Sequence, residues 1–271
     1  MPHPAPLRQP HVEFVRIGGQ HIRTARWAGN SPLPLLIFNG IGGNFEILEP
    51  LVDALGDHEV LMFDAPGAGA SSTPSVPYGI SAVARLGSLL LKRYHYDRAD
   101  VMGVSWGGAA ALAFARGAPH RCRRLILCAT MAGGGAFWPG KPGVMMRMMS
   151  PKRYLSRRYM HDHIGALYGG RFRDDAEFAD AYIRRMRRPS QIGYALQVAA
   201  ISTWSSLPWI RSIRHPTLVL HGKDDPIVPA INARIMKTLL RNAELQLVDD
   251  GHLLLVAQAA ESARRIREFL A

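Results

Sequence analysis

The stretch Gly103-Val104-Ser105-Trp106-Gly107-Gly108 constrains the fold of this chain more than any other. It follows the short apolar run Val101-Met102 and opens a segment of small residues that is typical of a helix. A serine with glycines two residues before and after it, at a strand-to-helix junction, forms a nucleophile elbow. The turn is so sharp that a β-carbon at either glycine would collide with neighbouring backbone. The serine hydroxyl is then exposed at a helix N-terminus, where free N–H groups favour developing negative charge.

Short apolar runs alternate with helical patterns along most of the chain. The first segment, Val12 to Trp27, predicts a β-hairpin around Gly18-Gly19. Strands that alternate with helices predict a mainly parallel sheet with helices on both faces, and binding residues then lie at the carboxyl ends of the strands. After the hairpin the predicted strands are 35–38, 60–63, 101–104, 125–128, 217–220 and 245–248, and the predicted core helices are 46–55, 81–94, 106–116, 231–240 and 259–270.

A serine hydroxyl becomes a good nucleophile only when a base removes its proton. The base is usually a neutral histidine that a carboxylate orients. In folds with this elbow, the carboxylate and the histidine follow the serine in that order, each after a strand. Here Asp224 and Asp225 follow the strand 217–220, and His252 follows the strand 245–248. We therefore predict a catalytic triad of Ser105, Asp225 and His252 at one edge of the sheet.

The choice between the two adjacent carboxylates rests on the loop register. Asp225 lies three residues after Gly222 and is followed by Pro226-Ile227-Val228-Pro229, which is the usual form of the acid loop in this class. We assign the acid role to Asp225 and expect Asp224, the alternative, to be an exposed loop residue. Some proteins of this class carry the acid after the preceding strand instead, but residues 129–140 contain no carboxylate.

Stabilising a negatively charged oxygen requires two backbone N–H donors aimed at one point, the oxyanion hole. Trp106, directly after the serine, is expected to supply one of them. The other is expected from the loop Asn39-Gly40-Ile41-Gly42-Gly43-Asn44, and by position it is Ile41. This loop begins with Asn-Gly where His-Gly is more common, a difference that does not affect a main-chain donor.

The region from Gly133 to Arg211 shows no clear strand pattern and breaks the alternation. It contains six of the 11 methionines and half of the Phe, Tyr and Trp residues. We predict a core formed by residues 1–132 and 212–271, and a helical cap, residues 133–211, inserted after the strand 125–128. Asp174 to Arg188 is expected to be one cap helix, with acidic residues in its first turns, arginines at its end and Pro189 as its stop.

The net charge of +12 is concentrated in the predicted cap. Residues 133–211 contain thirteen Lys or Arg against five Asp or Glu, a balance of +8. No motif of a nucleic-acid-binding module accompanies this charge, so we expect no nucleic-acid partner. An anionic surface is the better candidate. The arginines of the predicted helix also complement its C-terminal dipole.

No pattern in the chain indicates a metal or a cofactor, and we expect neither. The two cysteines, Cys122 and Cys128, are too few for a disulfide framework or a four-ligand zinc site, and Cys128 lies in an apolar run that predicts a buried thiol. His161 and His163 lack a recognisable third ligand. The glycines of residues 64–69 resemble a phosphate-binding loop, but we expect a structural turn there.

Neither a signal peptide nor a membrane span is expected. Met1 to Pro6 contains no basic region followed by an apolar one. No apolar run reaches the ~18 residues that a membrane span requires. A cytoplasmic protein is the expectation that follows.

These residues together make the chain similar to the α/β-hydrolases over nearly its whole length. More specifically, it resembles the intracellular depolymerases of medium-chain-length poly(3-hydroxyalkanoate). Several of the matching stretches lie in the predicted cap, which varies most within the superfamily. The resemblance implies that Ser105, Asp225 and His252 hydrolyse ester bonds of a storage polyester held in cytoplasmic granules. The matching stretches are residues 37–42, 69–74, 103–108, 139–142, 150–154, 168–170 and 249–252.

Other functions of the same machinery stay open at this point. A carboxylesterase or lipase-like enzyme, a carbon–carbon bond hydrolase and a 3-hydroxyacyl transferase would use the same residues. A granule-coating protein without activity is expected to lack a triad member. Polyester synthases of related fold carry cysteine at the elbow, and haloalkane dehalogenases need a carboxylate at position 105, so Ser105 argues against both.

Overall fold

A computed structural model describes residues 8–17 and 19–271 of the chain. Eight strands form one sheet in the order β1-β2-β4-β3-β5-β6-β7-β8. The pairs β1–β2 and β2–β4 are antiparallel and the other five are parallel, so the predicted, mainly parallel sheet is confirmed. The strands are β1 (His11–Ile17), β2 (Gln20–Trp27), β3 (Leu35–Phe38), β4 (Val60–Phe63), β5 (Ala99–Val104), β6 (Cys122–Cys128), β7 (Thr217–Gly222) and β8 (Ala243–Val248).

The predicted hairpin is the pair β1–β2, whose register runs from His11 opposite Arg26 to Ile17 opposite Gln20. Gly18 and the segment Met1 to Pro6 lie outside the described residues. Within those residues, no helix is long and apolar enough to cross a membrane.

Helices cover both faces of the sheet because alternate side chains of the buried strands point to opposite sides. Leu35 and Ile37 of β3 belong to one apolar cluster, and Leu36 and Phe38 belong to the other. The first cluster includes residues of α1 (Glu49–Ala54), α11 (Leu254–Ala257) and α12 (Ala259–Leu270). The second includes residues of α2 (Ile80–Arg93), α3 (Trp106–Gly117) and α10 (Ile231–Leu239).

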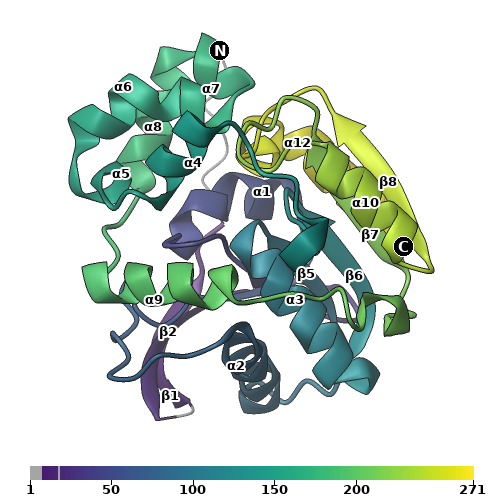
Figure 1. Cartoon of the computed structure of the whole chain (residues 1–271). Coiled ribbons are helices and arrows are strands. Elements are labelled where there is room, and N and C mark those ends of the chain that lie inside the picture. The colour runs from purple at the N-terminus through teal and green to yellow at the C-terminus, as the bar shows by residue number, and fades with distance from the viewer. Residues whose placement is uncertain (1–7, 18) are drawn as a thin grey trace, which may run out of the picture.

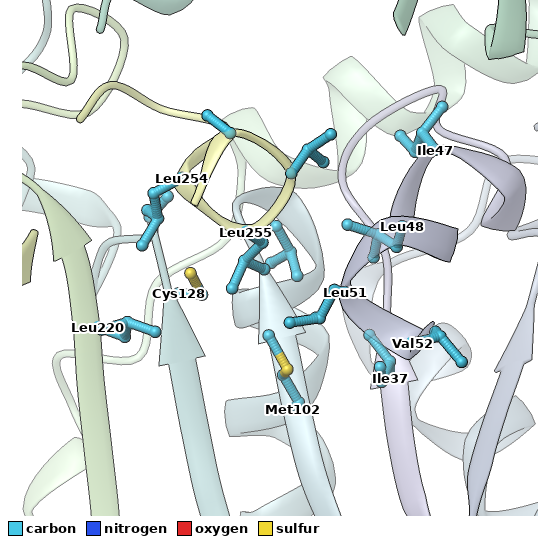
Figure 2. Packing of buried hydrophobic residues seen from close by; sticks show 14 of the residues in the cluster. Ile37, Ile47, Leu48, Leu51, Val52, Met102, Cys128, Leu220, Leu254 and Leu255 are labelled. Atoms are coloured by element: carbon cyan, nitrogen blue, oxygen red, sulfur yellow. The ribbon is translucent and has the colours of Figure 1, made fainter. Parts of the chain in front are cut away.

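Figure 2 shows part of the first cluster, where Leu254 and Leu255 of α11 lie above the strand residues Met102 and Cys128. Cys128 is a free, fully buried thiol, as predicted, and burial raises its pKa well above the usual value. This packing fixes α11 beside the carboxyl ends of the strands. The loop that precedes α11 carries His252.

Between β6 and β7 the chain forms a group of helices at the carboxyl ends of the strands. In Figure 1, α4 to α8 gather at the upper left and α9 lies below them. The helices are α4 (Pro142–Met149), α5 (Lys152–Leu155), α6 (Arg157–Tyr168), α7 (Arg171–Asp174), α8 (Ala176–Arg185) and α9 (Gln191–Ser202). Among the described residues of this region, the only strand-like feature is an isolated bridge between Gly133 and Ser205.

The single helix predicted for Asp174 to Arg188 is wrong at both ends. Asp174 ends α7, and the carboxylate of Asp175 caps the next helix by accepting from the N–H of Phe178. That helix, α8, ends at Arg185 because Met186 is extended. Tertiary contacts fix this ending: the N–H of Arg187 donates to Asn44 Oδ1, and its Nε donates to Glu46 at 2.9 Å.

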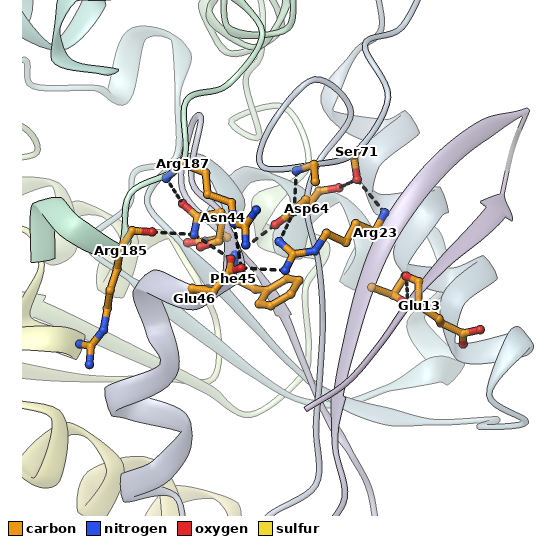
Figure 3. A network of polar contacts seen from close by, with 12 residues as sticks. Glu13, Arg23, Asn44, Phe45, Glu46, Asp64, Ser71, Arg185 and Arg187 are labelled. Atoms are coloured by element: carbon orange, nitrogen blue, oxygen red, sulfur yellow. Dashed lines mark hydrogen bonds and ion pairs between the residues drawn. The ribbon is translucent and has the colours of Figure 1, made fainter. Parts of the chain in front are cut away.

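These contacts belong to a polar network that joins the inserted helices to the core (Figure 3). Glu46 accepts from both Arg187 and Arg23, and Arg23 also pairs with the buried carboxylate of Asp64 at 3.3 Å. Asn44 donates to the carbonyl of Arg185. The network lies directly after the loop 39–44, so it fastens one end of that loop to the end of α8.

Candidate active site

Ser105 occupies a strained turn between β5 and α3. Its φ is +52°, which is rare for a residue other than glycine. A β-carbon on Gly103 would lie 2.3 Å from the carbonyl oxygen of Gly107, and one on Gly107 would lie 2.1 Å from that of Phe38. Only glycine fits at both positions, as the elbow pattern predicts. Thr130 supports the turn by donating its hydroxyl to the carbonyl of Ser105 at 2.7 Å.

The three side chains predicted as a triad lie in one hydrogen-bonded chain. His252 Nε2 is 3.0 Å from Ser105 Oγ, and His252 Nδ1 is 2.7 Å from Asp225 Oδ2. The backbone N–H of His252 also donates to the carbonyl of Tyr168 at 2.7 Å. Asp225 and His252 are buried, so both are shielded from competing water. This arrangement lets the imidazole accept the serine proton at Nε2 while the carboxylate holds Nδ1–H.

The environment of Asp225 keeps its carboxylate ionised. Burial by itself would raise the pKa of Asp225, but the charge of His252 and hydrogen bonds from His221 and His252 lower it to about 2. The N–H groups of Ile227 and Val228 both donate to Oδ1 at 2.9 Å, which leaves Oδ2 for His252. An ionised carboxylate here selects the imidazole tautomer with its proton on Nδ1.

Asp224 lies outside the hydrogen-bonded chain of Ser105, His252 and Asp225, as the loop register predicts. Its side chain is 51% exposed, and its Oδ2 accepts from Arg173 at 2.9 Å and from the N–H of Gly170 at 2.9 Å. Asp224 therefore joins the loop after β7 to α7. The two adjacent carboxylates thus have separate surroundings, one buried beside His252 and the other on the surface.

Ile41 and Trp106 lie beside the nucleophile, and both line a cavity with Ser105. Within the described chain, neither backbone N–H donates to another protein group, so both remain for a ligand oxygen. Asn39 shapes the loop by donating to the carbonyl of Asn44 and accepting from the next N–H in the chain. The position of the two donors as an oxyanion hole stays a prediction.

The structure adds Gln197, a residue that no motif identifies. Its side chain is fully buried, and Oε1 accepts from the N–H of Gly42 at 2.7 Å. Its backbone carbonyl accepts from the indole Nε1 of Trp106 at 3.0 Å. One residue of α9 therefore contacts both segments that carry the predicted oxyanion donors.

Two side chains of α5 also hold the loop 39–44 in place. Tyr154 Oη donates to the carbonyl of Ile41 at 2.7 Å, and the Arg153 guanidinium donates to that oxygen at 3.2 Å. The peptide between residues 41 and 42 is thus held at both its C=O and its N–H. The stretch 150–154 is part of the family resemblance, but contacts between segments more than a hundred residues apart leave no local pattern.

An apolar cavity of about 280 Å³ opens beside Ser105. None of the described residues that line it is charged, and its methionines come from the loop after β6 and from α4. Methionine adapts to irregular apolar shapes, so this cavity suits a flexible alkyl chain. The apolar residues that line it include Met131, Phe137, Met145, Met148, Met149, Val198, Ile201 and Trp204.

The other histidines and glycines singled out in the sequence have structural partners. His221 is buried with Nε2 2.7 Å from the carbonyl of Val228, and His163 Nδ1 is 2.9 Å from that of Tyr159. Gly67 packs against the backbone of α9, where a β-carbon would lie 2.4 Å from Gly193 Cα. Across residues 8–17 and 19–271, no group of three His, Cys, Asp or Glu side chains is placed to hold a metal ion.

Comparison with known proteins identifies the family of the chain. The model of the alpha/beta hydrolase fold family matches residues 34–257. The chain is 44% identical over 267 residues to a poly(3-hydroxyalkanoate) depolymerase of Ectopseudomonas oleovorans, covering 97% of this chain and 94% of that protein. It is 31% identical over 265 residues to a 2-hydroxy-6-oxo-2,4-heptadienoate hydrolase of Pseudomonas putida, covering 90% of each.

Solved structures agree on the fold. The enol-lactonase from Burkholderia xenovorans LB400 superposes with a TM-score of 0.81 at 22% identity, covering 95% of this chain and 99% of that one. A hydrolase from Pseudomonas aeruginosa PA01 superposes with a TM-score of 0.83 at 23% identity, covering 96% of this chain and 98% of that one. At this level of identity the two structures bear on the fold alone.

Proposed function

Because the chain belongs to the α/β-hydrolase family, we propose that it is an ester hydrolase whose substrate is medium-chain-length poly(3-hydroxyalkanoate). The observation that carries the proposal is the hydrogen-bonded chain from Asp225 through His252 to Ser105, beside an apolar cavity. The 44% identity to a poly(3-hydroxyalkanoate) depolymerase over 97% of the chain supports the substrate class.

In the proposed reaction Ser105 Oγ attacks the ester carbonyl carbon while His252 Nε2 takes the hydroxyl proton. The N–H groups of Ile41 and Trp106 donate to the carbonyl oxygen as it becomes negative. When the C–O bond breaks, His252 gives the proton to the departing alkoxide. An acyl group is left on Ser105.

Water then attacks the acyl-enzyme with His252 again as the base, and the acid product leaves. Asp225 stays ionised throughout because its pKa is about 2, and it stabilises the imidazolium that forms twice per cycle. Neither step calls for a metal or a redox cofactor.

Three rival functions use the same residues and differ in the acceptor or in the bond that breaks. A carboxylesterase prefers small esters, and a 3-hydroxyacyl transferase passes the acyl group to a thiol or alcohol instead of water. A carbon–carbon bond hydrolase is favoured by the 31% identity to 2-hydroxy-6-oxo-2,4-heptadienoate hydrolase. The higher identity to the depolymerase, 44% over 97% of the chain, favours the polyester over this alternative.

We also propose that the enzyme works on the surface of cytoplasmic polyester granules. The surface of the inserted helices carries large apolar side chains, among them Trp138 at 64% exposed and Met146 at 74%. Both lie near residues that line the cavity, Phe137 before Trp138 and Met145 beside Met146. We assign adsorption on the granule to these exposed apolar side chains, since apolar surface of this kind marks interaction sites.

The test is incubation of the purified protein with emulsified medium-chain polyester, short-chain polyester and p-nitrophenyl esters, with the products identified. Release of 3-hydroxy acids from the medium-chain polymer supports the proposal. Turnover of small esters or of a carbon–carbon substrate with the polymer intact contradicts it.

The nucleophile is tested in the same assay. Ser105→Ala should lower kcat about 10⁶-fold, leaving what binding and the oxyanion hole contribute. Ser81→Ala, an exposed serine on α2, is the matched control. A serine-reactive phosphonate should add its mass to the peptide that contains Ser105. Labelling of another serine with Ser105 unmodified would show that the assignment is wrong.

A further inference from the structure

Arg153 is a buried cation beside the candidate active site. Its side chain is only 3% exposed, and no ion pair joins it to a carboxylate in the part of the chain that the structure describes. Its guanidinium donates instead to three neutral oxygens, Tyr194 Oη, Tyr168 Oη and the Ile41 carbonyl, each at 3.2 Å. A guanidinium has five N–H groups, so two of them remain for a further acceptor.

Arg153 lines two cavities. The inner one is also lined by Ser105 and His252. The outer one, of about 300 Å³, is also lined by Arg157 and Arg188, which are both exposed. Arg153 therefore lines both the cavity that contains the nucleophile and the cavity that contains two further cations.

The outer cavity is strongly positive. Of the seven residues in the described chain that line it, three are arginines and none is acidic, the others being Tyr154, Met160, Ile183 and Met186. Burying a cation without an opposite charge is unfavourable, and an anion that binds there offsets this cost. Arginine presents paired N–H groups whose geometry matches a carboxylate.

Building on the function proposed above, we propose that Arg153, with Arg157 and Arg188, binds the free carboxylate at the end of a 3-hydroxyacyl chain. The last ester bond of that chain then lies at Ser105. In a 3-hydroxyacyl unit only two carbon atoms separate the ester oxygen from the carboxyl carbon. A carboxylate held beside the active site therefore selects the terminal unit as the leaving group.

The proposed step balances without a further reactant. Ser105 Oγ bonds to the carbonyl carbon of the penultimate unit, and the C–O bond to the terminal unit breaks. His252 gives its proton to the departing oxygen, which releases a 3-hydroxyalkanoate. Water hydrolyses the acyl-enzyme and leaves a shortened chain with a new carboxyl end. The enzyme thus removes single units from that end.

The direction in which the substrate chain binds follows from the linings of the two cavities beside Ser105. The apolar cavity beside Ser105 is lined, among residues 8–17 and 19–271, by uncharged side chains alone, so it accepts an alkyl group. The inner cavity is lined mainly by apolar side chains, but also by Arg153 and three tyrosines, so we assign the polar end of the chain to it.

The experiment compares two forms of one substrate, the dimer of 3-hydroxyoctanoate with a free carboxyl group and its methyl ester. The wild-type enzyme should favour the acid in kcat/KM by about 10- to 100-fold, the effect of a charge-assisted contact. Arg153→Gln, and Arg157→Gln combined with Arg188→Gln, should each reduce this preference at least tenfold. Free 3-hydroxyoctanoate should inhibit the wild type and inhibit these variants less.

The ratio of kcat/KM for the acid dimer to that for its methyl ester shows whether Arg153 binds the carboxylate or only positions the loop that contains Ile41. Arg153 also holds the Ile41 carbonyl, so a purely structural role would slow both dimers equally and leave the ratio unchanged. Arg158→Gln is the matched control, because Arg158 is exposed next to Arg157 but lines neither cavity.

Equal kcat/KM for acid and methyl ester in the wild type would overturn the carboxylate site. Hydrolysis of both dimers in that case would leave the proposed function standing. The carboxylate site would also be overturned if the ratio of kcat/KM for the acid to that for the methyl ester were unchanged in both sets of variants. Hydrolysis of neither dimer, with the polymer hydrolysed in the assay above, would overturn the site and leave the proposed polyester substrate standing.

Discussion

At the scale of single residues, the site depends on two neighbouring carboxylates with opposite surroundings. Asp225 is buried and bonded to His252, whereas Asp224 is half exposed and bonded to the backbone and side chain of α7. Sequence alone distinguishes them only by register. A shift of one residue in the loop would exchange their roles.

We predict that Asp225→Asn lowers kcat by about 10⁴-fold while the protein stays folded, because an amide favours the wrong tautomer of His252. Asp224→Asn should change kcat little, since it alters only contacts to Arg173 and to the N–H of Gly170 outside the hydrogen-bonded triad. The two variants are matched in chemistry and in sequence position. Steady-state kinetics with a p-nitrophenyl ester measures both, and the opposite order of effects would show that the assignment is reversed.

The low pKa of Asp225 also links stability to pH. Its pKa is about 2 in the folded protein and about 3.9 in an unfolded chain, so the folded state favours the ionised form. This contribution to the free energy of unfolding is fully present above about pH 4 and is lost as the pH falls toward about 2. Urea unfolding of wild type and Asp225→Asn at pH 5 and pH 3 should show a smaller stability difference at pH 3. A constant difference would contradict the linkage.

At the scale of elements, α9 and α5 position a loop of the core from outside it. Gln197 on α9 contacts the N–H of Gly42, and Arg153 and Tyr154 on α5 contact the carbonyl of Ile41. The donors of an oxyanion hole must be held in place before the reaction to be effective. The inserted helices therefore contribute to the geometry of the site as well as covering it.

We predict that Gln197→Met lowers kcat about 10- to 100-fold, because small displacements of reacting groups have effects of this size. KM for a small ester should change less than kcat, since the side chain is buried outside the apolar cavity. Gln191→Met, an exposed position at the start of the same helix, is the control. Loss of Tm in proportion to the loss of kcat would instead indicate a general structural role.

At the scale of the whole molecule, charge and apolar surface gather on the same inserted region. Part of the charge serves the fold, since Arg187 pairs with Glu46 of the core at 2.9 Å. The exposed apolar side chains have no such internal role. In the proposed function these side chains adsorb to polyester, and added salt does not weaken such an apolar contact, unlike attraction between charges.

We predict that Trp138→Ser combined with Met146→Ser weakens co-sedimentation with emulsified medium-chain polyester about tenfold or more, at low and at high salt alike. Burying such a side chain contributes on the order of 1.5–3 kcal/mol. Val76→Ser removes an equally exposed apolar side chain that lies outside the inserted region, and it should leave co-sedimentation unchanged. Weakening only at low salt would assign adsorption to the arginines instead.

The sequence by itself determined the sheet, the elbow and the three predicted triad residues. Glycine spacing around Ser105 and apolar runs ending in polar loops are local patterns, so physical chemistry over a few residues specifies them. The strands 35–38 and 60–63 have the predicted bounds, and others extend by only a few residues.

Only the tertiary structure decided which groups surround those residues. The end of α8 at Arg185 depends on Asn44 and Glu46, which lie about 140 positions away in the chain. The role of Gln197 and the burial of Arg153 likewise arise from contacts with residues 41 and 42. Such contacts form only when distant segments pack together, and each side chain alone is compatible with a solvated surface. That is why the sequence predicts the reacting groups, while the groups that hold them and the cavities beside them require the fold.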